Sequence, residues 1–393
     1  MVAESARIER VKLKDLPALA ASSVDSASPG TFIPITKHRA LALTQNPFAA
    51  PEDVAMLLAK QGDRNVGYFG VMPVMLQYEG KLHKAHWLTT WAVAPEFLGK
   101  GLGSQLMEAA LAMDIDLAIV GSKPARRVSS KYGFHKLQTL QYVQIDFRMA
   151  GRYNLLSLFL RLIRKLASLV RVRLPIETLD RTFSRFFELL LGWLVRPLIY
   201  SLALGGGSSE LQGVNIKNVS QVDPPGVEAA DKNRTGFYRD SHVVNWMLAY
   251  PWVLPAGKSE SEKLNYGFTD SRPGFKFVAW QLYSATDENL GYICFQVSRL
   301  RGQTVVKVLD SDLTPGNPNV LLSLTLQFAK DQHASLIEGT SELAEPLRGG
   351  LGSLLTVQRR RICQVHSRSA DSPMAQAWQE IEQTYCDGDM AFT

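Results

Sequence analysis

A glycine-rich turn between an expected strand and an expected helix has the residue spacing needed to bind a phosphate group. Gly99, Gly101 and Gly103 occupy alternate positions within residues 93–104. Because these positions carry no side chains, successive backbone N–H groups can converge on one anion. The helix behind them adds unpaired N-terminal N–H groups and the positive end of its dipole. The pattern predicts a pyrophosphate-binding loop, although ordinary turn geometry also accounts for glycines at a helix start.

The residues around this turn resemble the acetyl-CoA loop of the GNAT acetyltransferase superfamily. That family has a strand ending in Val-x-Pro, followed by Arg/Gln-x-x-Gly-x-Gly/Ala; Leu98 stands here in place of the Arg or Gln. The resemblance implies acetyl-CoA as the ligand, with the strand end pairing with the pantetheine arm and the loop amides binding the pyrophosphate. The implied ligand-binding residues are Trp91, Ala92, Val93, Leu98, Gly99, Lys100, Gly101, Leu102, Gly103 and Ser104.

A second segment, residues 125–134, resembles the family's other CoA motif, a short helix ending in Gly-Phe. Many members place a tyrosine in this helix as the general acid, and the spacing from Gly133-Phe134 puts Ser129 at that position. The resemblance further implies that a backbone N–H near Val93 stabilises the oxyanion formed on the thioester. Ser129 and the Val93 backbone are therefore the predicted catalytic groups. The sequence predicts no metal site, because the seven histidines show no metal-ligand spacing.

The sequence does not reveal a general base for the acceptor. Strict strand alternation counted back from Val93 makes Trp91, Thr89 and Trp87 the inward positions, and none of them is a base. By the same alternation His86 falls on the opposite face of the strand, and it is interpreted as a structural residue. A water chain, or a group from the second half of the chain, would have to accept the proton.

The order of expected elements occurs twice, which predicts two domains of one fold. The first half shows strands, a helix, a strand, a short helix and a last strand, at residues 65–77, 82–93, 103–113, 116–120, 124–131 and 135–147. The second half repeats this order at residues 276–283, 291–299, 304–313, 319–330, 334–338 and 361–366, with a short helix near Leu343. We expect an α/β (α+β) protein with two tandem GNAT-like domains, each a mixed, mostly antiparallel sheet flanked by helices. The expected boundaries are 1–150, 151–209 and 210–393.

The second domain is predicted not to bind CoA. Its equivalent loop, residues 313–319, contains Pro318, which lacks an N–H, and has no second glycine. A Gly-rich run at 347–353 follows the wrong strand and is better matched to the Gly-Phe corner. Segments 238–240, 246–252 and 387–392 resemble tandem GNAT-like proteins associated with bacterial surface-polysaccharide pathways; the alternative for the first two is a helix packed by two tryptophans.

Residues 153–203 are expected to form an amphipathic helical hairpin between the domains. The stretch 152–200 holds nine basic and three acidic residues, which equals the net charge of +6, so the rest of the chain is balanced at 34 against 34. Outside this stretch the sequence therefore has no excess of basic residues of the kind that binds nucleic acid. The wide apolar faces leave two interpretations open: a brace between the domains, or reversible attachment to an anionic membrane surface.

The remaining composition places the chain in a reducing compartment. Cys294, Cys363 and Cys386 form no CxxC pair and no closed disulfide set, so they are expected to be small buried hydrophobic residues. The first 15 residues show no signal peptide. We expect a cytoplasmic protein, or one peripheral on the inner face of the membrane.

The sequence favours an acetyl-CoA-dependent N- or O-acetyltransferase that acts on a small-molecule or glycan-linked acceptor. The alternative is a non-catalytic acyl-CoA-binding or scaffold protein at the membrane surface, because a base and the usual tyrosine are both missing. Aminoacyl transfer from tRNA is disfavoured by the balanced charge outside the helical pair.

Overall fold

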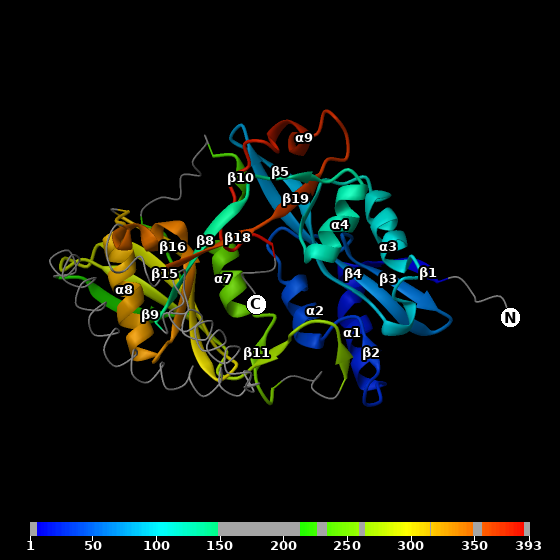
Figure 1. The fold of residues 1–393 in the computed structure, drawn as a ribbon, viewed down its shortest axis with the longest axis horizontal. Coiled ribbons are helices and arrows are strands. Elements are labelled where there is room, and N and C mark those ends of the chain that lie inside the picture. The colour runs from blue at the N-terminus through cyan, green and yellow to red at the C-terminus, as the bar shows by residue number, and fades with distance from the viewer. Residues whose placement is uncertain are drawn as a thin grey trace, which may run out of the picture. The chain divides into compact units, whose positions relative to one another are not determined.

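The computed structural model describes residues 6–147, 213–225, 234–258, 264–314, 316–348 and 356–388. The predicted helical hairpin at 153–203 lies outside these residues. Contacts divide the chain into two compact units, which Figure 1 shows together with their helices and strands. Unit 1 comprises residues 1–140, 220–276 and 361–393, and unit 2 comprises residues 141–219 and 277–360.

Unit 1 is built on a mixed sheet. The main path of that sheet, in the part of the chain that the structure describes, runs β1-β3-β4-β5-β6-β19-β7, and β10 pairs with β4. These strands are β1 (Arg7–Lys12), β3 (Val54–Gln61), β4 (Arg64–Tyr78), β5 (Lys81–Val93), β6 (Leu117–Val120), β7 (His135–Lys136), β10 (Gly236–Phe237) and β19 (Cys363–His366). The β5–β6 pair is parallel, whereas β1–β3, β3–β4, β4–β5, β6–β19 and β7–β19 are antiparallel.

Helices cover this sheet, and two of them follow the glycine-rich turn and the second motif. The helices are α1 (Leu16–Asp25), α2 (Lys37–Thr44), α3 (Leu102–Leu111), α4 (Lys123–Lys131), α7 (Ser241–Ala249) and α9 (Pro373–Ala377). Leu106 and Met107 of α3 are fully buried against Phe69 of β4 and Leu88 of β5. Short strands β2 (Phe32–Ile33) and β12 (Asn265–Tyr266) pair in parallel, as do β11 (Leu254–Pro255) and β13 (Ser271–Arg272).

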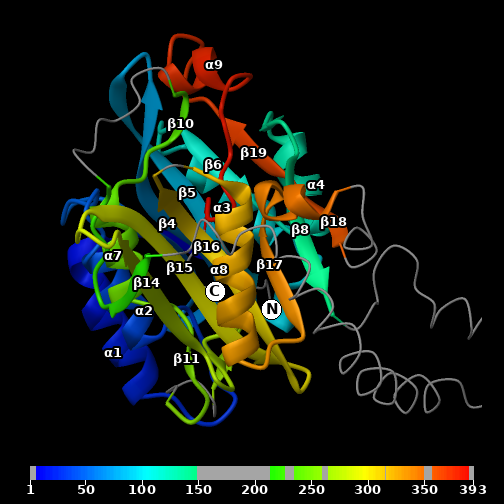
Figure 2. The ribbon, with the colours of Figure 1, turned by 90° about the vertical axis from the view of Figure 1, so that its left-hand side faces the viewer.

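Unit 2 repeats the pattern of a sheet covered by a long helix. Its strands run in the order β18-β8-β17-β16-β15-β14-β9. They are β8 (Leu140–Asp146), β9 (Asn215–Val219), β14 (Lys276–Tyr283), β15 (Asn289–Leu300), β16 (Gln303–Leu313), β17 (Leu336–Thr340) and β18 (Thr356–Arg361). Figure 2 shows α8 (Pro318–Asp331) lying across the strands of this sheet. Phe328 of α8 stacks on Phe295 of β15 with ring centroids 4.2 Å apart.

The two sheets flanked by helices confirm the predicted fold class. One detail differs from the sequence prediction: residues 135–147 do not form one strand. They form β7, which belongs to the sheet of unit 1, and β8, which pairs antiparallel with β17 in unit 2. Strand β19 makes the reciprocal exchange, since it follows β18 of unit 2 in sequence but pairs with β6 of unit 1. The units are thus interleaved along the chain rather than separated by the expected boundaries.

Candidate functional site

Strands β5 and β6 diverge, and no strand of the described residues pairs with this edge of β5 beyond Leu88. Their parallel pairing covers only three positions of β5, from His86 to Leu88. Beyond this point β5 continues to Val93, while β6 ends at Val120. Backbone groups on the open edge of β5 can therefore pair with an extended ligand instead of a strand.

A β-bulge lies in β5 just beyond the residues that pair with β6. The pairing of β4 with β5 shifts register between Tyr68 and Gly70, opposite the segment that contains Thr90. Thr90 has a φ of 39°, which is uncommon for a β-branched residue. A Cβ on Gly70 would lie 2.5 Å from the Oγ1 atoms of both Thr89 and Thr90, so the bulge requires glycine at this position. The extra residue changes which side chains share a face of β5.

The bulge overturns the predicted alternation along β5. Leu88 lies in the core beneath α3, and Trp91 packs against the same core although it is three positions later. The Trp91 ring stacks on Phe69 with centroids 4.7 Å apart. Trp87 instead contacts Phe237, with ring centroids at 4.5 Å. The prediction that Trp91, Thr89 and Trp87 share one face is wrong, because strict alternation does not hold across a bulge.

One backbone donor of β5 points toward the open edge. The Ala94 N–H donates to the Val66 carbonyl oxygen at 2.9 Å and so points toward β4. Since successive N–H groups alternate in direction in the regularly paired part of β5 after the bulge, the Val93 N–H points away from β4. This amide is oriented to donate to a carbonyl oxygen lying along the open edge.

Two glycines of the glycine-rich turn adopt left-handed backbone conformations. Gly99 and Gly101 have φ values of 76° and 82°, in the left-handed region that favours glycine, and Gly101 is the N-cap of α3. The first intrahelical donor is the N–H of Gln105, which bonds to the Gly101 carbonyl. Among the described residues, the N–H groups of Leu102, Gly103 and Ser104 have no partner within the helix, so they form a donor group for an anion. The Lys100 amide differs from the expectation, since it donates to the Phe97 carbonyl oxygen at 3.2 Å.

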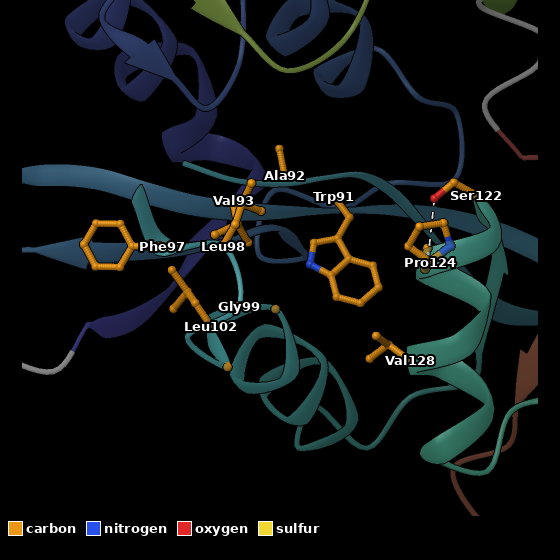
Figure 3. Close-up of a pocket in the computed structure, with 13 residues that line it drawn as sticks. Trp91, Ala92, Val93, Phe97, Leu98, Gly99, Leu102, Ser122, Pro124 and Val128 are labelled. Atoms are coloured by element: carbon orange, nitrogen blue, oxygen red, sulfur yellow. Dashed lines mark hydrogen bonds between the residues drawn. The ribbon is translucent and has the colours of Figure 1, made fainter. Parts of the chain in front are cut away.

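A cavity of about 410 Å³ occupies the space between β5, the glycine-rich turn and α4. Figure 3 shows the Trp91 side chain directed between α3 and α4, and Ala92 directed to the opposite side of the strand. Eight predicted ligand residues line the cavity: Trp91, Ala92, Val93, Leu98, Gly99, Gly101, Leu102 and Gly103. Lys100 and Ser104 are not among the lining residues.

Five further lining residues were not predicted from the sequence: Phe97, Ser122, Pro124, Ala125 and Val128. Pro124, Ala125 and Val128 lie on one face of α4. The helical spacing of the second motif was the sequence signal that could have identified them. The Ser122 side chain caps α4 by accepting a hydrogen bond from the Ala125 N–H at 3.5 Å, which fixes the start of this helix.

Ser129, the predicted general acid, does not line the cavity. Its side chain is fully buried, and its hydroxyl donates to the Gln364 Oε1 at 2.8 Å. It also lies 3.2 Å from the carbonyl oxygens of Ala125 and Arg126. The prediction that this hydroxyl protonates a leaving thiolate has no support in the geometry, because the group faces β19 and is already bonded there.

The charge around the cavity is positive on one side. Lys123, Arg126, Arg127 and Lys131 all lie on α4, which contains no acidic residue. The Lys100 ammonium lies 5.3 Å from the centre of the Phe97 ring beside the glycine-rich turn. None of these basic residues lines the cavity, but their positive charge on two of the elements that line it favours an anionic ligand.

No lining residue of this cavity carries a side chain that titrates near neutral pH. His86 is buried outside the lining, and burial lowers its pKa from 6.5 to about 4. Among the residues that the structure describes, no group of His, Cys, Asp and Glu side chains could hold a metal ion. The geometry is therefore suited to bind and polarise a ligand through the backbone rather than to exchange protons with it.

The family comparison agrees with this geometry. Residues 25–125 match the model of the acetyltransferase (GNAT) family. Residues 25–125 are therefore similar to a GNAT acetyltransferase domain. The matched residues include β5, the glycine-rich turn, α3 and the start of α4, which together supply all lining residues of the cavity except Val128. A search of curated protein sequences finds no match.

Solved GNAT structures are similar to this chain over most of its length. A GCN5-related N-acetyltransferase from Anabaena variabilis is 10% identical, with 93% of this chain and 74% of that chain covered and a TM-score of 0.45. One from Kribbella flavida is 13% identical, with coverages of 96% and 74% and a TM-score of 0.45. A tandem GNAT protein from the clavulanic acid biosynthesis pathway is 10% identical, with coverages of 93% and 100% and a TM-score of 0.43.

Two further sequence expectations concern residues away from the cavity. The three cysteines are free and buried. The tryptophan segment packs in unit 1: the Trp246 Nε1–H donates to the Ala42 carbonyl oxygen at 2.8 Å, and Trp252 is 1% exposed. In the described part of the chain, no helix is both long and apolar enough to cross a membrane.

Proposed function

We propose that the protein transfers an acetyl group from acetyl-CoA to an amine or hydroxyl of a small-molecule or glycan-linked acceptor. The observation that carries this proposal is the cavity at the open edge of β5, with the glycine-rich turn at one end. The pyrophosphate would accept from the N–H groups of Leu102, Gly103 and Ser104 at the start of α3. The pantetheine arm would lie along β5 beyond Leu88, where none of the described strands pairs with this edge.

The chemistry asked of the protein is electrostatic. The acceptor attacks the thioester carbon, negative charge develops on the carbonyl oxygen, and the Val93 N–H is oriented to donate to that oxygen. A preorganised backbone donor of this kind typically contributes about 10²–10³-fold to kcat. The mostly apolar lining lowers the local dielectric constant and so strengthens this hydrogen bond.

The acceptor must supply an unprotonated nucleophile, since no lining side chain of the cavity is a base near neutral pH. We therefore expect kcat/KM to rise with pH until the ammonium pKa of the chosen amine is passed, and to follow the acceptor rather than the protein. The test is a pH series with two amines of different pKa. Superimposable profiles for the two amines would place the base on the protein.

The lack of a basic side chain in the cavity lining also favours a second candidate, a non-catalytic acyl-CoA-binding protein at a membrane surface. The two candidates separate in one experiment. Saturating acetyl-CoA is incubated with a panel of amines and amino sugars, and CoA thiol release is measured. Binding without release for any acceptor favours the second candidate. Acceptor-dependent release supports the transferase.

A further inference from the structure

The face of β5 opposite α3 and α4 is the side from which an acceptor must approach. Helices α3 and α4 close the cavity on one face, where Trp91 packs between them. Ala92 points to the other face and also lines the cavity. Tyr68 is paired with Ala92 across the two strands, so its side chain stands on that same face. Because the ligand would enter between the helices and β5, the second reactant has only this opposite face available.

A short segment of unit 1 covers this face at Gly267. A Cβ at Gly267 would lie 3.0 Å from the Ala92 Cβ and 3.0 Å from the Tyr68 hydroxyl oxygen. The backbone at Gly267 therefore contacts Ala92, which lines the cavity. A larger residue at position 267 would have to displace this backbone. Gly267 also donates its N–H to the Tyr68 hydroxyl at 3.3 Å. Gly267 thus contacts both Ala92 and the Tyr68 hydroxyl on this face of β5.

The Tyr68 hydroxyl is a hydrogen-bond donor without an acceptor in the described structure. The side chain is 0% exposed and packs among the rings of Phe32, Tyr266 and Phe268, at centroid distances of 5.4, 6.2 and 6.3 Å. Its oxygen accepts from Gly267, and among the described residues no acceptor lies within hydrogen-bond distance of its own O–H. Burial raises the pKa of Tyr68 well above its usual value, so the proton stays on the oxygen at neutral pH. A buried donor of this kind carries the cost of desolvation without a compensating bond.

The covering segment is held by few backbone bonds. Strand β12 pairs with β2 over only two residues, Asn265 opposite Phe32 and Tyr266 opposite Ile33. Beyond Gly267 the chain is fixed at Thr269, whose carbonyl oxygen accepts from the buried Arg39 guanidinium at 2.8 Å. A small displacement between Asn265 and Phe268 would free the Tyr68 hydroxyl and would move the Tyr266 ring, whose centre lies 5.1 Å from the Arg39 guanidinium, while the bond from Arg39 to Thr269 stays in place.

We propose that Tyr68 donates a hydrogen bond to the reacting acyl group from the acceptor face, and that residues 265–268 withdraw to admit the acceptor. The proposal rests on the proposed acetyl transfer. In that reaction the acceptor nitrogen bonds to the acyl carbon, the C–S bond breaks, and CoA leaves as the thiolate. The nitrogen gives its proton to solvent. Tyr68 keeps its own proton throughout and only supplements the backbone donor of β5.

The test uses the full chain, acetyl-CoA and hydroxylamine, a small nucleophile that is largely unprotonated at neutral pH. The variant Tyr68→Phe should lower kcat by about 10- to 100-fold, while the acetyl-CoA dissociation constant and the hydroxylamine KM change less than twofold. The control Tyr292→Phe removes a buried hydroxyl of unit 2 that donates to Asp310 at 3.1 Å, and should leave kcat unchanged. Unchanged kcat in Tyr68→Phe would overturn the role of Tyr68. Failure of the parent chain to bind acetyl-CoA would instead overturn the proposed function as well.

A second variant tests the covering segment independently. Gly267→Ala places a methyl group against Ala92 and the Tyr68 hydroxyl, so residues 265–268 should be displaced. We expect faster hydrogen–deuterium exchange at these residues and a severalfold lower hydroxylamine KM. Exchange and KM equal to those of the parent chain would show that the segment does not control access.

Discussion

The Ser129 hydroxyl donates a 2.8 Å hydrogen bond to the Gln364 side chain, which joins α4 to β19 across 235 positions of sequence. The side-chain Nε2 of Gln364 in turn donates to the Ser130 hydroxyl at 2.8 Å. Gln364 lies at the centre of β19, between β6 and β7. A residue predicted from its spacing to be a general acid therefore links the cavity helix to the strand that returns from the second half of the chain.

Ser129→Ala should reduce stability and leave catalysis intact. The change leaves the buried Gln364 carbonyl without its donor, which costs about 1–3 kcal/mol of unfolding free energy. Chemical denaturation measures this loss. The control Ser22→Ala removes an exposed hydroxyl that bonds to the Leu19 carbonyl, and should have little effect. A tenfold fall in kcat with unchanged unfolding free energy would restore Ser129 as the general acid.

Leu98→Arg should strengthen acetyl-CoA binding. Leu98 lines the cavity, is 65% exposed, and occupies the position where the GNAT loop has Arg or Gln. A cation there would lie near the phosphates at low cost, because the native side chain is not packed. We expect a several-fold lower dissociation constant at low salt and a smaller gain at high salt. Equal affinity of the variant and the parent at low salt would place the phosphates elsewhere.

His86 should make the protein less stable in mild acid. Burial lowers its folded-state pKa to about 4 from an unfolded value of 6.5. The stabilisation of the neutral ring is complete above pH 6.5 and is lost as pH falls toward 4, on the order of 3 kcal/mol in total. Urea titrations across this range should show a shallower pH dependence for His86→Gln. Some slope should remain, since burial also lowers the pKa of His366. Identical slopes in variant and parent would exclude His86 as a source.

The sequence was informative where a local pattern determines the local structure. The helix periodicity behind Gly101 and the Val-x-Pro strand end located β5, the turn and α3 within one or two residues. The bulge at Thr90 was not predictable, because it depends on Gly70 in the neighbouring strand. The exchange of β8 and β19 was also missed, since strand partners are set by long-range pairing rather than by the strand's own residues. Tyr68 was overlooked for the same reason: its contact, Gly267, lies 199 residues away.

Residues 153–203 are predicted to bind anionic membranes reversibly. Arg161, Arg164, Lys165, Arg171 and Arg173 lie within the first expected helix. Each basic residue near such a surface contributes about 1 kcal/mol, and salt should weaken the attraction. Co-sedimentation with phosphatidylserine-containing vesicles compares the full chain with a variant in which Arg161, Arg164 and Lys165 are changed to Glu. Parent chain that stays in the supernatant at low salt would assign the helices to bracing the domains.

The central claim is that one acetyl-CoA binds at the glycine-rich turn of unit 1, and isothermal titration of the full chain tests it most directly. We expect one site per chain, because Pro318 removes an N–H from the equivalent position of unit 2. Gly101→Glu places a carboxylate at the phosphate position and should abolish binding. Gly30→Glu is the matched control, since Gly30 has a φ of 83°, nearly that of Gly101, and open space around it. Binding of one acetyl-CoA that Gly101→Glu abolishes and Gly30→Glu preserves is the predicted result; two sites, no binding at millimolar ligand, or unaltered binding in Gly101→Glu would contradict it.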